Sequence, residues 1–392
     1  METSYWPVPV TLPSDSLVEL NERKSLMMAP VVSFITILMS VGLIGNSLVL
    51  YVYWFKTSRK AERTFIMTLA ILDITNCLLV MPFEMYDLTH QYTFGDVATC
   101  KTMRVLEYSV IMASGFVLVS VSFDRYFNIC KTFSEFSPRK AKVIGIVCAI
   151  IATSLGWPAF YFADIQVKSV ESTNLTGQEC SMVKAGPLEE NLLKAFYFCL
   201  ATIFLLCIVV LSFIYLLIGI RIRKWLIHRK LMQLQSTPSV RMNRIMSTEN
   251  DVRESNSSEH SPSGSARSST ARTHVISIRT AIIFFSVTAV FIISFLPHII
   301  VRFLQLLHMN FNGNEEVVYN FIVRSYLINS AANPFVYTIL NRRFRVKLKD
   351  TFRRCFRRTM MRRDANYTDA YNRTLTASQR FVSSKVVFRF NP

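Results

Sequence analysis

Seven long stretches of the sequence are almost free of charged side chains, and this feature limits the possible folds more than any other. They cover residues 30–55, 64–83, 108–123 with extensions at both ends, 143–163, 195–220, 280–301 and 317–340. A helix of ~20 apolar residues crosses the ~30 Å hydrocarbon layer. Lipid offers no hydrogen-bond partners, and the stretches lack the alternation of a β-barrel. The sequence therefore predicts an all-α membrane protein, a seven-transmembrane helix bundle.

The charged residues give this bundle a direction in the membrane. The chain is 51% hydrophobic and 18% charged, with a net charge of +18. Basic residues follow the first, third, fifth and seventh stretches, among them Lys56, Arg59, Lys60, Arg63, Arg139, Lys140, Arg221, Arg223, Lys224, Arg342, Arg343 and Arg345. Basic loops stay in the cytoplasm. We expect a multi-pass plasma-membrane protein with its N-terminus extracellular and its C-terminus cytoplasmic, and no nucleic acid partner.

Cysteines and a glycosylation sequon bear on the same topology. Of the eight cysteines, only Cys100 and Cys180 fall in segments expected to lie outside the cell. We predict that they form a disulfide, because that compartment is oxidising; two unrelated free thiols are the alternative. Asn174 begins an Asn-Leu-Thr sequon in the same outer loop and is expected to carry a glycan. Cys355, in the tail, is a candidate for palmitoylation.

Composition divides the chain into four segments. We expect an extracellular N-terminal arm (1–28), a seven-transmembrane domain (29–340) that includes a disordered third inner loop (231–273), an amphipathic membrane-surface helix (341–356) and a cytoplasmic tail (357–392). The inner loop is too polar to bury a core. Residues 341–356 place aromatic and aliphatic side chains among basic ones, which suits a helix on an anionic leaflet.

Several polar residues lie inside the predicted spans, where a charge costs ~2.5–3.5 kcal/mol. Asp73 is the only charged residue of the second span. The seventh span holds Arg324, Asn329, Ser330 and Asn333. Such density indicates an interior site for water or an ion, whereas helix-to-helix hydrogen bonding is the alternative.

Two short motifs resemble the signatures of a known family. Asp124-Arg125-Tyr126 ends the third span, and Asn333-Pro334-Phe335-Val336-Tyr337 lies in the seventh. Together with Gly45-Asn46, the stretch 69–73 and the cysteine pair, they resemble the rhodopsin-like (class A) G-protein-coupled receptors over residues 29–356. The resemblance implies a receptor that binds an extracellular ligand and activates heterotrimeric G proteins through outward movement of span six. It also implies arrestin and receptor kinases as partners of the tail, and membrane lipid around the bundle.

The resemblance assigns roles to residues that match the family's motifs. For G-protein coupling these are Asp124, Arg125, Tyr126, Phe133, Tyr215 and Tyr337; for the activation switch Phe291, Phe295, Pro297, Asn333 and Pro334; and for an allosteric sodium pocket Asp73, Ser114, Asn329, Ser330 and Asn333. Two departures matter. Phe295 stands where the family usually has tryptophan, and Ser277 stands where many relatives carry an acid that restrains the arginine. We therefore expect measurable basal signalling.

The outer half of the spans carries both signs of charge, which suits a peptide ligand. The candidate ligand-pocket residues are Glu84, Asp87, Arg104, Glu107, His298, Arg302 and Gln305. The stretch 124–131, DRYFNICK, is similar to neuropeptide receptors of the cholecystokinin and orexin type. The alternative is a biogenic-amine receptor with Glu107 as the ammonium counter-ion. A further alternative is that Glu107 contacts no ligand and forms an ion pair inside the protein, with Arg104 or Arg324.

Other classes of function fit the sequence less well. An enzyme would need a nucleophile motif, a phosphate-binding glycine loop or a metal-spaced histidine cluster, and the six histidines form none. A transporter would be expected to show inverted repeats. We therefore expect a protein that is not an enzyme and has no cofactor or metal other than Na⁺.

Overall fold

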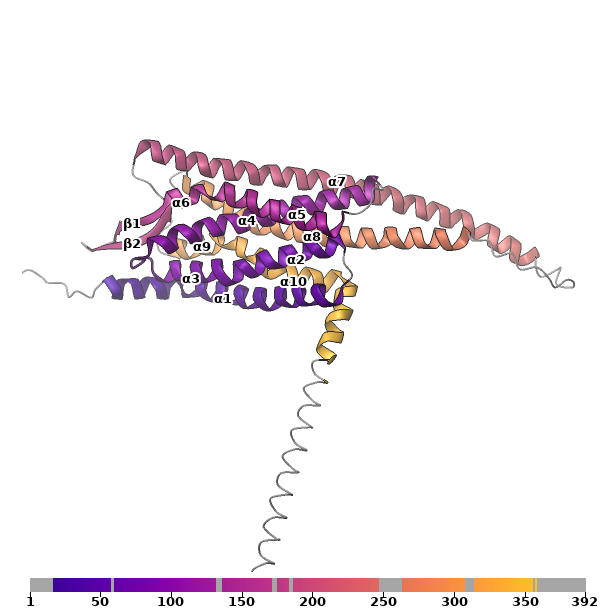
Figure 1. Cartoon of the computed structure of the whole chain (residues 1–392), viewed down its shortest axis with the longest axis horizontal. Helices are drawn as coiled ribbons and strands as arrows, with labels where there is room; N and C mark the ends of the chain where they lie inside the picture. The colour runs from indigo at the N-terminus through magenta and orange to yellow at the C-terminus, as the bar shows by residue number, and fades with distance from the viewer. Residues whose placement is uncertain are drawn as a thin grey trace, which may run out of the picture. The chain divides into compact units, whose positions relative to one another are not determined.

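The computed structural model describes residues 17–57, 60–131, 136–170, 175–182, 186–246, 263–306, 314–354 and 357. Its elements (Figure 1) are α1 (Leu17–Lys56), α2 (Ala61–Thr75), the π-helical turn η1 (Asn76–Val80), α3 (Met81–Thr89), α4 (Val97–Tyr126), the π-helical turn η2 (Phe127–Lys131), α5 (Pro138–Gly156), α6 (Pro158–Phe162), β1 (Ala163–Ser169), β2 (Thr176–Met182), α7 (Pro187–Met246), α8 (Ser263–Leu306), α9 (Asn314–Val323), the 3₁₀ turn η3 (Ser325–Leu327) and α10 (Ile328–Leu340).

Six helical stretches of the described part are long and apolar enough to cross a membrane. They are Leu17–Phe55, Ala61–Thr89, Val97–Cys130, Pro138–Phe162, Pro187–Met232 and Ser277–Leu304. The expected seventh span consists of α9 and α10, which the turn η3 separates. The interruption shortens both helices but leaves the apolar character of residues 317–340 unchanged.

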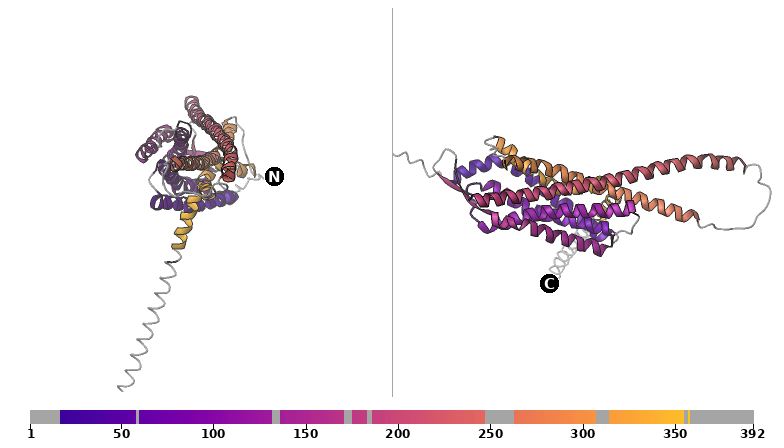
Figure 2. Two further views of the ribbon diagram at one scale, coloured as in Figure 1. Left: turned by 90° about the vertical axis from the view of Figure 1, so that its right-hand side faces the viewer. Right: turned by 90° about the horizontal axis from the view of Figure 1, so that it is seen from above.

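The helices up to α10 lie side by side along one axis (Figure 2). α4 contacts α2, α5, α6, α7 and α8. Its buried positions include Gly115, Val117 and Val121, which lie among neighbouring helices rather than on a lipid surface. Backbones approach closely where glycine allows it: a Cβ on Gly45 of α1 would come within 2.6 Å of the Pro334 side chain in α10. The seventh span is thereby held against the first.

An antiparallel hairpin covers one end of the bundle, which we call the hairpin end (Figure 1). β1 pairs with β2 from Ala163 opposite Met182 to Ser169 opposite Thr176. The disulfide between Cys100 and Cys180 joins β2 to the first turn of α4. The predicted pairing is therefore confirmed. The opposite end, which carries Asp124 and Arg125, is called the motif end.

Helices extend into two segments that were expected to be irregular. α1 begins at Leu17, inside the expected arm 1–28. α7 continues to Met246 and α8 begins at Ser263, so helix occupies both ends of the expected disordered loop 231–273. The physical reason is cooperativity: a formed helix extends without a new nucleation step. The amino-acid composition of a segment does not show whether a neighbouring helix will extend into it.

Beyond residue 341 the chain belongs to a second unit, of which the structure describes a helix over 342–354 and residue 357. This range coincides with most of the expected amphipathic helix 341–356. Phe133, Asn174 and Cys355 lie outside the described residues, as does the tail beyond 357. Their expected roles in coupling, glycosylation and palmitoylation remain predictions.

Candidate functional site

At the motif end, Arg125 is buried against the acid that precedes it. Asp124 and Arg125 are 1% and 2% exposed. The Arg125 Nε lies 3.1 Å from the Asp124 Oδ2, and Nη2 contacts the same oxygen. The other Asp124 oxygen accepts a hydrogen bond from the backbone N–H of Phe136 at 3.2 Å. The Arg125 guanidinium carbon lies 6.0 Å from the ring centroid of Phe284 in α8. The arginine is therefore covered by protein and neutralised by its neighbour.

The three tyrosines that the resemblance assigns to G-protein coupling have different surroundings in this arrangement. Tyr126 is half-buried, with its ring 5.7 Å from that of Phe127. The Tyr215 hydroxyl accepts a hydrogen bond from Thr288 at 3.4 Å. Tyr337 is fully buried, and its hydroxyl has no hydrogen-bond partner among the described residues. Both tyrosines are thus buried within the bundle in this arrangement.

A buried cluster of polar side chains, which we call the polar chamber, comes from α1, α2, η1 and α10. Asn333 donates a hydrogen bond to Asp73 at 2.7 Å. Asn76 donates to the Ser330 hydroxyl at 2.8 Å, and Asn46 donates to the Ser330 carbonyl at 2.7 Å. All five residues are less than 5% exposed. The structure therefore brings together three of the five residues expected for a sodium pocket and adds Asn46 and Asn76, which that set lacked.

The chamber contains oxygen atoms that no described group satisfies. The side-chain oxygens of Asn46, Asn76 and Asn333 are buried without a hydrogen-bond partner in the described part, and so is that of Asn329, elsewhere in α10. Ser114 bonds the Val110 carbonyl of its own helix, at 3.0 Å. Carboxylate and amide oxygens are ligands that suit a hard cation, and they also suit ordered water. The residues present fit Na⁺. The signal for Asn76 was its spacing, one helical turn after Asp73.

Aromatic rings fill the middle of the bundle beside α8. The ring centroids of Phe291 and Phe295 are 4.6 Å apart. The ring centroid of Phe204 in α7 lies 5.9 Å from that of Phe291 and 5.7 Å from that of Phe295. A Cβ on Gly115 of α4 would come within 3.3 Å of the Phe291 ring. The two expected switch residues are therefore in contact with each other and with α4 and α7. Pro297 lies inside the same helix, and Pro334 lies inside α10.

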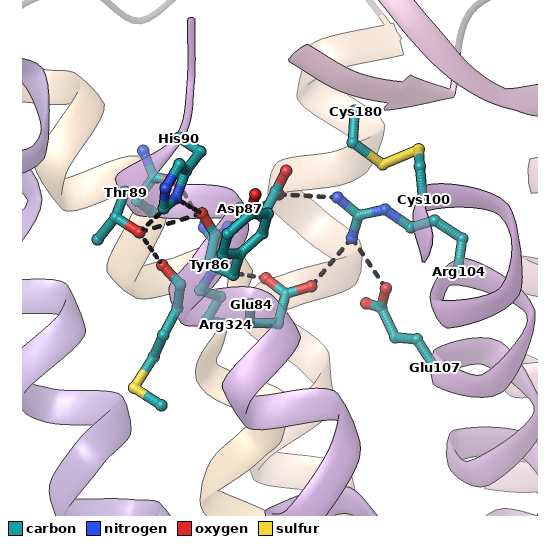
Figure 3. Close-up of polar contacts among 12 residues, drawn as sticks. Glu84, Tyr86, Asp87, Thr89, His90, Cys100, Arg104, Glu107, Cys180 and Arg324 are labelled. Carbon is teal, nitrogen blue, oxygen red and sulfur yellow. Dashed lines mark hydrogen bonds and ion pairs between the residues drawn. A yellow bond between two sulfur atoms is a disulfide. The ribbon is translucent and has the colours of Figure 1, made fainter. Parts of the chain in front are cut away.

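Near the hairpin end, five charged side chains from α3, α4 and the seventh span form a buried ion cluster (Figure 3). Arg104 contacts Glu84 at 2.9 Å, Asp87 at 2.8 Å and Glu107 at 2.9 Å. Arg324 contacts Glu84 at 2.6 Å and Asp87 at 3.8 Å. Their side chains are 4% to 16% exposed, with Asp87 the most exposed. Three carboxylates face two guanidinium groups, a formal charge of −1 when all five are ionised, and the positive charge of Arg302 in α8 also acts on Glu84.

The expected ligand-pocket residues divide into two groups. Glu84, Asp87, Arg104 and Glu107 come together in the cluster, whereas His298 and Arg302 of α8 contact the seventh span instead. His298 Nδ1 contacts the Val323 carbonyl, and Arg302 donates to the Tyr319 hydroxyl at 3.3 Å. The side chain of Gln305 lies outside the described part.

Glu107 pairs with Arg104 within the protein, as one reading of the sequence allowed. Its second oxygen accepts a hydrogen bond from the Tyr326 hydroxyl at 2.9 Å. Arg324 and Tyr326 were not among the expected pocket residues. A charge inside a span pointed to Arg324, whereas Tyr326 gave no signal in the sequence.

One family comparison bears on this arrangement. The family described as 7 transmembrane receptor (rhodopsin family) matches residues 45–337. The match covers most of the chain, and it contains the motif end, the polar chamber and the ion cluster.

Proposed function

The chain belongs to the rhodopsin family of seven-transmembrane receptors, and on this premise we propose that it is a cell-surface receptor for a neuropeptide. Members of the family are multi-pass plasma-membrane signalling receptors and not enzymes, so the chain is a class A G-protein-coupled receptor with a seven-transmembrane helical bundle. The expected fold class and the expected non-enzymatic function are confirmed. The ligand class and the choice of G protein belong to the proposal.

The ion cluster is the observation that supports a peptide ligand. It presents carboxylates and guanidinium groups from three spans within one region, and an ordinary peptide carries groups complementary to both signs. The excess negative charge favours a peptide with a basic side chain. A biogenic amine is the weaker candidate, because Arg104 and Tyr326 already neutralise and hydrogen-bond Glu107, its proposed counter-ion.

We place the hairpin end outside the cell and the motif end in the cytoplasm. The disulfide at the hairpin end and the basic residues beyond the motif end both support this orientation. The N-terminus is then extracellular. The tail beyond 357 would meet receptor kinases and arrestin, and the helix at 342–354 would lie on anionic lipid.

The proposed mechanism turns on the burial of Arg125. In this structure Asp124 and Phe284 cover it, which corresponds to a resting state. Outward movement of the motif end of α8 would remove Phe284 and expose the guanidinium to a Gα subunit. Na⁺ in the polar chamber would stabilise the resting state, with Asp73 and Asn333 among the residues that hold it. A ligand drives the change only to the extent that it binds the open state more tightly.

A screen of amidated peptides tests the proposal. Cells that express the receptor are exposed to peptide pools and to a set of biogenic amines, with calcium and cAMP read together. The proposal predicts that a peptide pool activates the receptor, that substitution of citrulline for arginine in the active peptide weakens it, and that Arg125→Ala abolishes the response. Activation by an amine alone, lost in Glu107→Gln, would favour the amine receptor.

A further inference from the structure

The seventh span is interrupted at Arg324. α9 ends at Val323, Arg324 has φ −100° and ψ 8°, the turn η3 follows, and α10 begins at Ile328. The backbone of Arg324 is therefore not helical. A short 3₁₀ segment between two helices is a place where one helix can shift relative to the other. Arg324 stands at this break, and α10 continues from it toward the motif end.

Arg324 is anchored to the ion cluster from this position. Its Nε lies 2.6 Å from Glu84, its Nη2 lies 3.8 Å from Asp87, and its Nη1 donates to the Asn320 side chain. The Arg324 side chain is 8% exposed and that of Glu84 is 4% exposed. Separating a buried ion pair of this kind is strongly unfavourable, because each charge is then left buried without a counter-charge or water around it. The pair therefore resists any movement that separates α10 from α3.

The two residues after Arg324 join the break to the other helices of the pocket. Ser325 donates to the Ser294 carbonyl of α8 at 2.8 Å. Tyr326 donates to Glu107 of α4 at 2.9 Å, and its ring centroid lies 5.7 Å from that of Phe295. Residues at the break thus contact both the ion cluster and the aromatic residues beside α8.

The break is also continuous with the polar chamber. α10 starts immediately after η3 and carries Asn333, which bonds Asp73. A displacement at Arg324 would therefore reach Asn333 through a single short helix, and Phe295 through Tyr326. Interfaces of this kind have discrete packing arrangements, so a small shift at one end can favour a different state at the other.

We propose that Arg324 is the positioning residue through which the seventh span senses the ligand pocket, and that its ion pair with Glu84 holds the receptor in the resting state. The inference rests on the proposed function, and it adds the residue that couples ligand binding in the pocket to movement of the seventh span. The pair exists in the arrangement that buries Arg125. A ligand group that competes for Glu84 would release Arg324 and, with it, the break in the seventh span.

The purified receptor in lipid nanodiscs provides two measurements that need no known ligand. The first is basal GTPγS binding to a panel of G proteins; the second is hydrogen–deuterium exchange in the receptor alone. For Arg324→Gln we expect basal exchange of nucleotide to rise about fivefold, at the lower end of typical allosteric coupling. Deuterium uptake over residues 323–340 should also become faster, while uptake in β1 and β2 stays unchanged.

Two variants separate the specific pair from a general loss of charge. Arg23→Gln removes a guanidinium from an exposed pair with Glu19 and should change neither measurement. Glu84→Gln should also raise both measurements, and the effects of the two changes should not multiply in the double variant, because both remove the Glu84–Arg324 pair, although Glu84→Gln also takes a carboxylate from Arg104. If Arg324→Gln does not fold, Tyr326→Phe removes one hydroxyl at the same break and should give a smaller rise in both measurements.

The two measurements also distinguish the inference from the proposed function. Unchanged deuterium uptake over 323–340 in Arg324→Gln would overturn the inference, even if basal activity rose by another route. Faster uptake without nucleotide exchange on any G protein would support the inference and count against the proposed function. A purely stabilising ion pair would instead lower the melting temperature and speed deuterium uptake throughout the bundle, β1 and β2 included, and that result would also overturn the inference.

Discussion

Arg125 is the most deeply buried arginine of the described residues, at 2% exposure. A guanidinium is expensive to desolvate, so its burial depends on the carboxylate of Asp124 and on the ring of Phe284. In the proposed mechanism, the charge of Arg125 is balanced in this arrangement and becomes accessible to a G protein in the active one. The consequences can be tested one side chain at a time.

Loss of the Asp124 carboxylate should activate the receptor. Asp124→Asn leaves Arg125 buried without its counter-charge, which disfavours the resting state, so basal GTPγS binding should rise about fivefold or more. Asp96→Asn is the matched control, because Asp96 caps α4 away from this site and asparagine caps a helix equally well. Equal basal activity in wild type and Asp124→Asn, at equal surface expression, would contradict this role.

Sodium should stabilise the resting receptor through Asp73. Replacing choline chloride with NaCl at constant ionic strength should raise the melting temperature, with ~1.4 kcal/mol of stabilisation when Na⁺ exceeds its Kd tenfold. Asp73→Asn should abolish the difference between the two salts, because among the described residues Asp73 supplies the chamber's one carboxylate. A variant that kept the full sodium response would show that the ion binds elsewhere.

At the scale of elements, the glycine on α1 and the proline on α10 control how closely two spans approach. A Cβ at Gly45 would lie 2.6 Å from the Pro334 side chain, too close without a shift of one helix. At Gly219 in α7, by contrast, an added Cβ meets nothing within 4 Å. The two positions differ in surroundings but not in residue type.

Gly45→Ala should therefore destabilise the bundle, whereas Gly219→Ala should not. We expect a loss of about 1–3 kcal/mol for Gly45→Ala from overpacking, seen as a lower melting temperature in detergent. Gly219→Ala should leave the melting temperature unchanged or raise it, since alanine favours a helix by ~1 kcal/mol. Equal melting temperatures for the two variants would mean that the spans adjust freely at this contact.

The motif end of α8 lacks the acid that restrains it in many relatives. Ser277 occupies that place and is buried, and Thr280 one turn later donates to Glu62 of α2 at 3.4 Å. This long hydrogen bond is a weaker restraint than an ion pair to Arg125 would be. Measurable basal signalling remains the prediction.

An acid placed at residue 277 should suppress that basal signalling. Ser277→Glu adds a carboxylate on the helix that covers Arg125, so basal GTPγS binding should fall toward that of vesicles without receptor. Ser277→Gln has similar size without the charge and should keep wild-type activity. The explanation fails if both variants reduce the basal rate equally, because size rather than charge would then be responsible.

At the scale of the whole molecule, the membrane explains why so much of the fold was predictable. Each span must satisfy its own backbone hydrogen bonds, so its position follows from a local count of apolar residues. The Cys100–Cys180 disulfide followed from topology for the same reason. The two signature motifs then located Asp124, Arg125, Asn333 and Pro334 without any knowledge of packing.

The unpredicted features all depend on contacts between distant segments. The sequence around Arg324 does not predict the break in the helix, because the break is stabilised by contacts with Glu84, Ser294 and Glu107 on other spans. The roles of Asn76 and Tyr326 likewise depend on which helices face each other. Sequence patterns identify charged residues inside the spans, and only the tertiary structure decides which carboxylate each arginine meets.

The central claim is that a signal at the hairpin end uncovers Arg125 at the motif end. Its most direct test is GDP release from purified G proteins by receptor in lipid vesicles, with and without the active peptide pool. The account predicts that the peptide accelerates release from at least one Gα class and that Arg125→Ala abolishes the acceleration. Release that is equal with and without peptide for every Gα class, and equal in wild type and Arg125→Ala, would contradict it.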